Sequence, residues 1–174
     1  AIVLFEPTFA AHIPLPTIDV LGVEAIVIAC YLSWRFFRMR SWARLFAAAV
    51  ASGAAMMIKH TALLVPIMFI AYAALDALRP QASAERRVSW KRRAHEIVVA
   101  GAIAFVVIWS LCFFDFAHPR APQARLNQPA RFSFLTRHRL PAALYATSLL
   151  EAVSHAGAGQ MGYLLGHRSK TGWW

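Results

Sequence analysis

Two long apolar runs, Val20–Phe37 and Ile97–Phe114, constrain this chain more than any other feature. A helix needs about 20 residues to cross the ~30 Å hydrocarbon core of a bilayer, and both runs come close to that length. The composition agrees, because 59% of the 174 residues are hydrophobic and only 15% are charged. Soluble domains are about 45–50% apolar and about 25% charged. The sequence therefore predicts an all-α, polytopic membrane protein.

Two shorter apolar runs lie between the long ones, at Leu45–Ile58 and Thr61–Leu78. The first is rich in Ala and Gly, and small residues allow the backbones of neighbouring helices to approach closely. We expect a transmembrane helix bundle in residues 1–114, with about four spans at 20–37, 45–58, 61–78 and 97–114. Residues 115–174 form a separate, extracytoplasmic loop region, in which Pro141–His155 has the spacing of an amphipathic helix lying along the membrane interface.

The basic residues fall mostly into connections between the apolar runs, which fixes a topology. Arg35, Arg38, Arg40 and Arg44 surround the first connection, and residues 79–96 form a second one. By the positive-inside rule both connections are cytoplasmic, so the start of the chain and Lys59 lie on the outer side. The net charge of +10 therefore reflects contact with membrane lipids and indicates no nucleic-acid partner. We assign the connection 79–96 no role beyond orientation and lipid contact.

A polar loop, Glu6–Asp19, precedes the first long run and contains three prolines, which a regular helix interior excludes. An acidic residue beside a hydrophobic span is costly unless it faces water, a partner or a substrate. Asp19 is therefore a candidate site residue, with helix capping as an alternative role that can coexist. Glu24, one turn further into the span, is expected to face the bundle or a wet cavity.

Lys59-His60 separates the second and third runs. A helix of fourteen residues rises only about 21 Å. The pair should then lie slightly below the outer surface, in a protein-lined cleft where a cation could meet an anion. The alternative is that Lys59 extends to the lipid headgroups.

The last sixty residues carry cations on the side of the membrane that is usually poor in positive charge. Such a pool would suit a phosphate-bearing lipid, with solvated loop charge as the alternative. Cys30 and Cys112 lie in apolar runs and should pack as small hydrophobes. The seven His residues are scattered, and no motif for a metal or a cofactor occurs, so neither is predicted. The cations of this segment are Arg120, Arg125, Arg131, Arg137, Arg139, Arg168 and Lys170.

Three motifs carry a family resemblance. Glu6–His12 with Thr17-Ile18-Asp19 resembles the "P-x-x-x-A-H … T-T-D" loop of glycosyltransferases related to protein O-mannosyltransferases and aminoarabinose transferases, which include glycosyltransferase family 39. Ile58–Leu64 resembles their "S-K-F-T-A-L-L" segment. Gly162–Gly166 with Gly172-Trp173-Trp174 resembles the "Y-L-L-G … G-W-W-Y-F-P" stretch of their large outer loop. The motifs occur in the family's order over nearly the whole chain.

The resemblance implies a GT-C membrane enzyme that transfers a sugar from a polyprenyl-phosphate donor to a lipid, protein or glycan acceptor at the outer face. Asp19 then matches an acidic residue near the active cavity, with Glu6 as a second catalytic candidate. Lys59 matches the lysine that holds the carrier phosphate. The remaining substrate-binding candidates are His12, His60, Arg168 and Lys170. Localisation would be a cell membrane, and the bacterial inner membrane in particular.

Some features depart from the family. His60 stands where the motif has Phe, Ile18 replaces a Thr, and the outer loop that bears the family's catalytic base precedes the residues present. We therefore expect an internal piece that is inactive by itself. One alternative is a transporter or channel fragment in which Glu24 and Lys59 form a charged relay. Another is a small structural membrane protein.

Overall fold

The computed structural model describes residues 18–78, 89–120, 137–158, 162–164 and 167–169, with side chains for 20–76, 89–120 and 137–154. The chain divides into two compact units, Ala1–Ile108 and Trp109–Trp174. The described residues are mostly helical, as the sequence predicts, with two short two-stranded sheets in the second unit.

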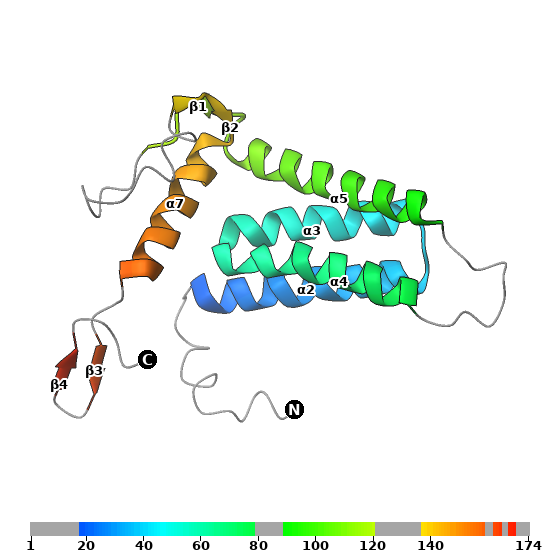
Figure 1. Cartoon of the computed structure of the whole chain (residues 1–174), viewed down its shortest axis with the longest axis horizontal. Helices are drawn as coiled ribbons and strands as arrows, with labels where there is room; N and C mark the ends of the chain where they lie inside the picture. The colour runs from blue at the N-terminus through cyan, green and yellow to red at the C-terminus, as the bar shows by residue number, and fades with distance from the viewer. Residues whose placement is uncertain (1–17, 79–88, 121–136, 159–161, 165–166, 170–174) are drawn as a thin grey trace. The chain divides into compact units, whose positions relative to one another are not determined.

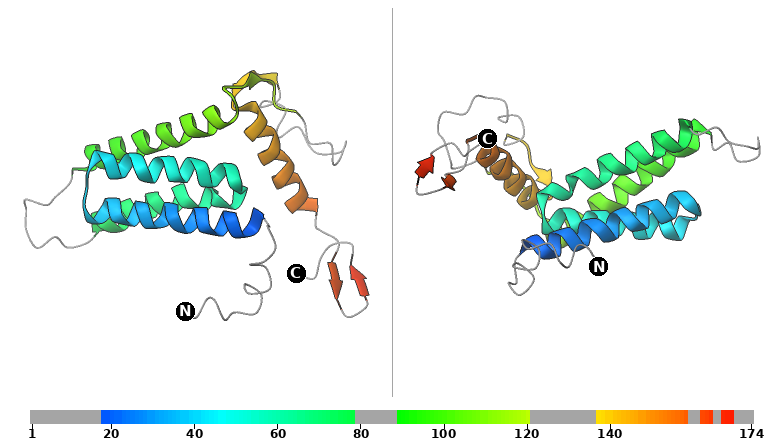
Figure 2. Two further views of the ribbon diagram at one scale, coloured as in Figure 1. Left: turned by 180° about the vertical axis from the view of Figure 1, so that it is seen from behind. Right: turned by 90° about the horizontal axis from the view of Figure 1, so that it is seen from below.

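The first unit is a stack of helices that run back and forth side by side (Figures 1 and 2). Helices α2 and α5 are long and apolar enough to cross a membrane, whereas α3 and the stretch His60–Asp76 are apolar but shorter. Two of the four expected spans thus have full length, and the other two stay predictions. The elements are α2 (Ile18–Arg38), α3 (Trp42–Ile58), the short 3-10 helix η2 (His60–Leu63), α4 (Leu64–Leu78) and α5 (Trp90–Leu111).

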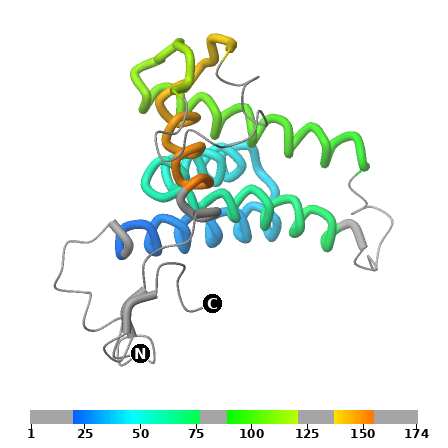
Figure 3. Tube along the Cα trace, turned by 60° about the vertical axis from the view of Figure 1, so that its left-hand side comes forward, coloured from blue at the N-terminus to red at the C-terminus, as the bar shows by residue number. Residues whose placement is uncertain are grey.

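Two ends of this unit matter for function, and the trace in Figure 3 lets the chain be followed between them. The hairpin end contains the start of α2, the end of α3 and η2. The network end contains the end of α2, the start of α3, the end of α4 and the start of α5. At the network end the Ser41 hydroxyl caps α3 by accepting a hydrogen bond from the Arg44 amide at 3.4 Å.

Close packing of α3 confirms the prediction from its small residues. A Cβ atom added to Gly53 would lie 2.7 Å from the Ala104 carbonyl oxygen and 2.9 Å from Val107 Cβ, both on α5. Only a residue without a side chain fits this contact. The buried Ser52 hydroxyl donates to the Ala48 carbonyl at 2.7 Å, so the helix satisfies it internally.

One apolar cluster holds the helices together towards each end of the first unit. Towards the network end, the rings of Phe36 and Phe69 stack with centroids 5.8 Å apart, and Leu45 and Ala100 pack beside them. Towards the hairpin end the buried residues are small, namely Ala29, Ala55, Ala62 and Val65. Small side chains there bring α2, α3 and η2 close together.

Helices α3 and α5 begin several residues before the expected positions. Helix α3 begins at Trp42, so it has 17 residues and rises about 26 Å, still short of the ~30 Å core. Helix α5 begins at Trp90, seven residues before the expected Ile97, because Ser89 accepts bonds from the Arg92 and Arg93 amides at 3.3 and 3.2 Å. The expected connection 79–96 therefore contains the first turns of a helix.

The second unit starts with the last turn of α5. Strands β1 (Phe116–Ala117) and β2 (Leu140–Pro141) pair antiparallel, and β3 (Gly162–Leu164) pairs with β4 (His167–Ser169). Helix α7 (Ala143–Ala158) covers most of the expected Pro141–His155 helix. It continues through residues 156–158, where a break was expected, and its position at the membrane interface stays a prediction. Burial raises the pKa of the Tyr145 phenol, and Cys112 adds to the rise.

We expect Gly53→Ala to destabilise the helix stack by about 1–3 kcal/mol, because its Cβ would overlap the α5 backbone. Gly101→Ala is the matched control, since a Cβ there meets nothing within 4 Å. Thermal unfolding of the purified full-length protein in detergent measures both. Equal melting temperatures for the two variants would contradict the close contact between α3 and α5.

Candidate functional site

The backbone of Lys59 is fixed at the point where α3 ends and η2 begins. Its φ and ψ of −150° and 131° are extended, which interrupts the helical path. Its amide donates to the Ala55 carbonyl at 3.0 Å, and its carbonyl accepts from the Ala62 amide at 3.0 Å. Both of its backbone groups are therefore used, and the half-buried side chain starts from a rigid position at the hairpin end.

The side chain of Lys59 packs against α2 at Gly22. A Cβ atom added to Gly22 would lie 3.0 Å from Lys59 Cδ and 3.3 Å from Lys59 Cβ. The absence of a side chain on Gly22 thus leaves room for the aliphatic part of the lysine. This contact joins the tip of the α3–α4 hairpin to the first turns of α2.

Asp19 lies on the same part of α2. It is three residues before Gly22, about one helical turn towards the N-terminus, and residues at that spacing share a helix face. Helix α2 begins at Ile18, so Asp19 lies inside the first turn and not ahead of the helix as expected. An acidic residue in the first turn interacts favourably with the helix dipole. Its side chain lies outside the described part of the structure.

The other predicted site residues are less well placed by the structure. His60 is the first residue of η2 and is half-buried beside Lys59. Arg168 belongs to β4, opposite Tyr163, and only its backbone is described. Glu6, His12 and Lys170 lie outside the described residues. The structure therefore brings together Lys59, His60 and the backbone of Asp19, and leaves the others as predictions.

Glu24 is not buried in the described helix stack, and its position at a wet cavity stays a prediction. Its side chain is exposed on α2 and does not face the interior of this helix stack. The position lies two residues after Gly22, which turns it away from the face that contacts Lys59. A relay that connects Glu24 with Lys59 through the described stack is therefore not supported.

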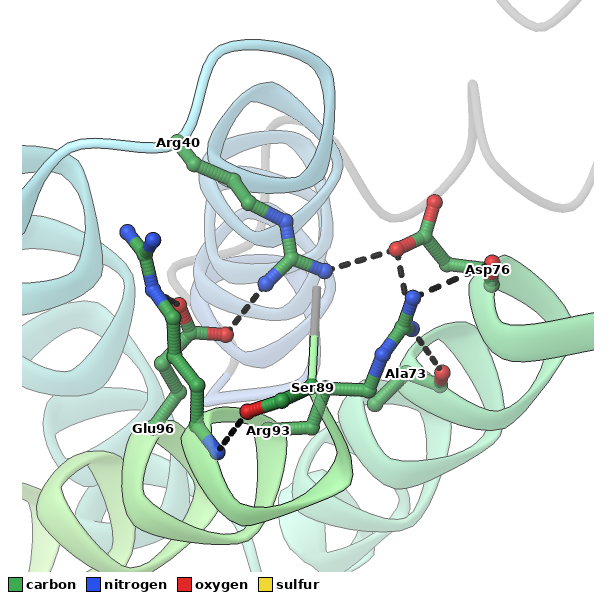
Figure 4. Close-up of polar contacts among 7 residues, drawn as sticks. Arg40, Ala73, Asp76, Ser89, Arg93 and Glu96 are labelled. Carbon is green, nitrogen blue, oxygen red and sulfur yellow. Dashed lines mark hydrogen bonds and ion pairs between the residues drawn. The ribbon is translucent and has the colours of Figure 1, made fainter. Parts of the chain in front are cut away.

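At the network end the structure contains a charge cluster that sequence reasoning missed (Figure 4). Arg40, from the α2–α3 connection, pairs with Asp76 of α4 at 2.6 Å and also with Glu96 of α5. Arg93 of α5 pairs with the same Asp76 oxygen at 2.9 Å and donates to the Ala73 carbonyl at 2.9 Å. We call these four residues, Arg40, Asp76, Arg93 and Glu96, the charge network.

The charge network is largely buried, so its charges are costly unless they stay paired. Arg93 and Glu96 are only 5% and 4% exposed, and Arg40 lies over the rings of Phe36 and Phe37 at 5.6 Å from each centroid. The two cations and two anions balance, which lowers the cost of placing charge beside an apolar core. One signal could have revealed the network, namely the acidic residues Asp76 and Glu96 at the edges of apolar helices.

A cavity of about 140 Å³ lies between α3, α4 and α5, with Met56, Phe69 and Ala100 among its walls. Its lining is almost entirely apolar, so it offers little to recognise a sugar or a phosphate. Among the residues with described side chains, no group of three or more His, Cys, Asp or Glu could hold a metal ion. The polar chemistry of the first unit is therefore located at its two ends.

A protein-family model described as dolichyl-phosphate-mannose-protein mannosyltransferase matches residues 1–111. This chain belongs to that family. As a family member it is a membrane glycosyltransferase, which confirms the family that the sequence resembles. The motifs at Glu6–Asp19 and Ile58–Leu64 lie inside the match, and the one at 162–174 lies outside it. The match includes Asp19, Lys59 and His60 and excludes Arg168 and Lys170. No curated protein and no solved structure gives a significant match to the chain.

Removal of the buried Arg93 charge should lower the free energy of unfolding more than removal of the exposed Arg92 charge. We expect Arg93→Gln to destabilise the helix stack by about 3–5 kcal/mol, because Arg40 would then be the one buried cation left for the two carboxylates of the network. Arg92→Gln should cost about 0–1 kcal/mol, since Arg92 is 58% exposed in its pair with Glu96. Denaturant unfolding of the full-length protein measures the difference. Similar losses for the two variants would contradict a structural role for the network.

Proposed function

We propose that the hairpin end is the donor site of an enzyme that transfers a sugar from a polyprenyl-phosphate carrier to an acceptor at the outer face of the membrane. Family membership supports the transferase chemistry. The observation that carries the proposal is the contact between Lys59 and Gly22, one helical turn from Asp19. It brings a cationic side chain and the backbone of an acidic residue to one end of the helix stack.

The chemistry assigns a different role to each residue. Lys59 holds the phosphate of the lipid carrier and stabilises the negative charge that grows on it as the sugar leaves. Asp19 accepts a proton from, or orients, the acceptor hydroxyl or amine that attacks the sugar. Direct attack on the lipid-linked sugar would invert the anomeric carbon. His60 and His12 contribute substrate contacts, and Glu6 is a second catalytic candidate. Arg168 and Lys170 are phosphate-binding candidates that belong to the second unit.

The charge distribution supports an outer position for this site. Arg35, Arg38, Lys91 and Arg92 are exposed, and all lie at the network end. The positive-inside rule then places the network end in the cytoplasm and the hairpin end on the outer side. The localisation that follows is a multi-pass protein of a cell membrane, and the family resemblance favours the bacterial inner membrane.

The recessed position of the hairpin end also supports the proposal. With 17 residues, α3 is shorter than a full membrane crossing. A cation at its end would lie near the level where the phosphate of a membrane-embedded lipid meets water. A phosphate bound there could stay attached to its polyprenyl chain in the bilayer while the sugar extends outward.

Sugar transfer should depend on Lys59 but not on a lysine at the other end. We expect Lys59→Ala to lower the turnover of the full-length enzyme on polyprenyl-phosphate sugar by about 10²–10³-fold. Lys59→Arg should keep part of the activity, and Lys91→Ala should keep all of it, because Lys91 is exposed at the network end. A radiolabelled-sugar transfer assay in membranes tests this. Full activity of Lys59→Ala would remove the donor-site assignment.

Asp19 has a matched control on its own helix. We expect Asp19→Asn to lower transfer by about 10²–10⁴-fold through loss of the base or orienting group. Glu24→Gln should leave transfer unchanged, because this acid is exposed away from the Lys59 contact. The same assay, with membrane insertion checked by immunoblot, distinguishes catalysis from folding. Equal effects of the two substitutions would contradict a specific role for Asp19.

Topology can be tested apart from activity. Thr61 is exposed at the hairpin end and Lys91 at the network end. In a background with Cys30 and Cys112 replaced by Ala, Thr61→Cys should react with a membrane-impermeant maleimide in intact cells. Lys91→Cys should react only after permeabilisation. The opposite pattern would place the hairpin end in the cytoplasm and exclude transfer at the outer face.

A further inference from the structure

Helix α5 ends in a Schellman motif with an unexpected residue at its left-handed position. The Phe114 amide donates to the Trp109 carbonyl at 2.9 Å, and the Phe113 amide donates to the Ser110 carbonyl at 3.0 Å. This pair of bonds defines the motif, whose left-handed residue is usually Gly because a Cβ is unfavourable there. Phe113 occupies that position with φ of 55°, and Phe114 follows with φ of 54°.

The backbone of this turn is firmly held. Trp109 Nε1 donates to the Asp115 carbonyl at 2.9 Å, and the Trp109 and Phe114 rings meet edge to face at 5.4 Å. The Asp115 carbonyl also accepts from the Ala142 amide at 2.9 Å, and Asp115 Oδ2 accepts from the Leu144 amide at 3.2 Å. These contacts connect the turn to the start of α7 and impose the left-handed conformation on both phenylalanines.

The ring of Phe113 gains little from the described protein, since the residue is 91% exposed. Phe114 is 60% exposed, and Phe116 and Leu144 beside the turn are 56% and 61% exposed. A strained backbone that presents an exposed aromatic ring is a reason to look for an external partner. Within the described part of the second unit, these four exposed apolar side chains lie at the turn or in the segments bonded to it, and we call them the phenylalanine turn.

Continuity with α5 identifies the partner. The turn directly follows a helix of 22 residues that is apolar enough to cross a membrane. Val98, Phe105 and Val106 are exposed along this helix, so its surface offers apolar side chains to lipid up to its end. The residues that follow the last turn of such a helix lie at the boundary between acyl chains and headgroups.

We propose that the phenylalanine turn, Phe113 with Phe114 and the adjacent Phe116 and Leu144, inserts into the lipid at the membrane boundary and anchors the start of α7 there. The rings enter the acyl-chain boundary, and the bonds to Asp115 transmit this anchoring to the first residues of α7. The anchor does not depend on the identity of the sugar donor or on the roles of Lys59 and Asp19.

Photo-crosslinking tests the partner directly. The photoreactive residue p-benzoylphenylalanine is introduced in place of Phe113 in the full-length protein, which is then reconstituted in vesicles of phosphatidylcholine and phosphatidylglycerol. The matched control carries it in place of Glu151, an exposed residue on α7 of the same unit. We expect lipid adducts, detected by mass spectrometry, to be at least several-fold more abundant at 113. Adducts at 113 that join only protein segments, or lipid adducts no more abundant than at 151, would overturn the proposal.

A second measurement does not depend on the photoreactive residue. Phe113→Asn keeps a side chain that tolerates the left-handed conformation and removes the apolar ring. If the ring is an anchor, amide hydrogen exchange in residues 113–117, measured in lipid nanodiscs, should be several-fold faster in Phe113→Asn than in the unsubstituted protein. If the ring has no lipid contact, relief of the backbone strain should leave exchange unchanged or slower, and that result would overturn the proposal.

Discussion

The charge network is the interaction on which the first unit depends most. Arg40 comes from a connection, Asp76 from the end of α4, and Arg93 and Glu96 from the start of α5, so one set of ion pairs joins segments far apart in the sequence. Because two cations and two anions balance, the network can lie beside the ring cluster of Phe36 and Phe69 without unpaired charge. Helices α3 and α5 start beside it, capped by Ser41 and Ser89.

The packing of the helices along their length determines where Lys59 lies at the hairpin end. The contact between Gly53 and the Ala104 carbonyl requires α3 and α5 to lie at a backbone-to-backbone distance along their middle. From there α3 has only a few residues left before Lys59, and the extended backbone at Lys59 ends it against Gly22 of α2. The candidate donor site is thus a consequence of helix length and small residues.

Glycine is present at two positions where close packing requires it, and it is absent from a third position where the backbone conformation favours it. At Gly22 and Gly53 the absence of a side chain allows a lysine or a backbone to approach. At the end of α5 the left-handed position that Gly usually fills holds Phe113. A residue that costs backbone energy and gains almost no packing from the described chain indicates that the benefit comes from outside it, which in a membrane glycosyltransferase means lipid.

The sequence by itself determined the class of protein, the approximate apolar helices and, through short motifs, the family. These follow from composition and local pattern, which need no knowledge of neighbours. Only the tertiary structure decided that Arg93 and Glu96 belong to a helix and pair with Arg40 and Asp76, because ion pairs between distant segments leave no periodic signal. For the same reason the exposure of Glu24 and the contact of Lys59 with Gly22 could not be predicted: which face of α2 is covered depends on how α3 and η2 pack against it.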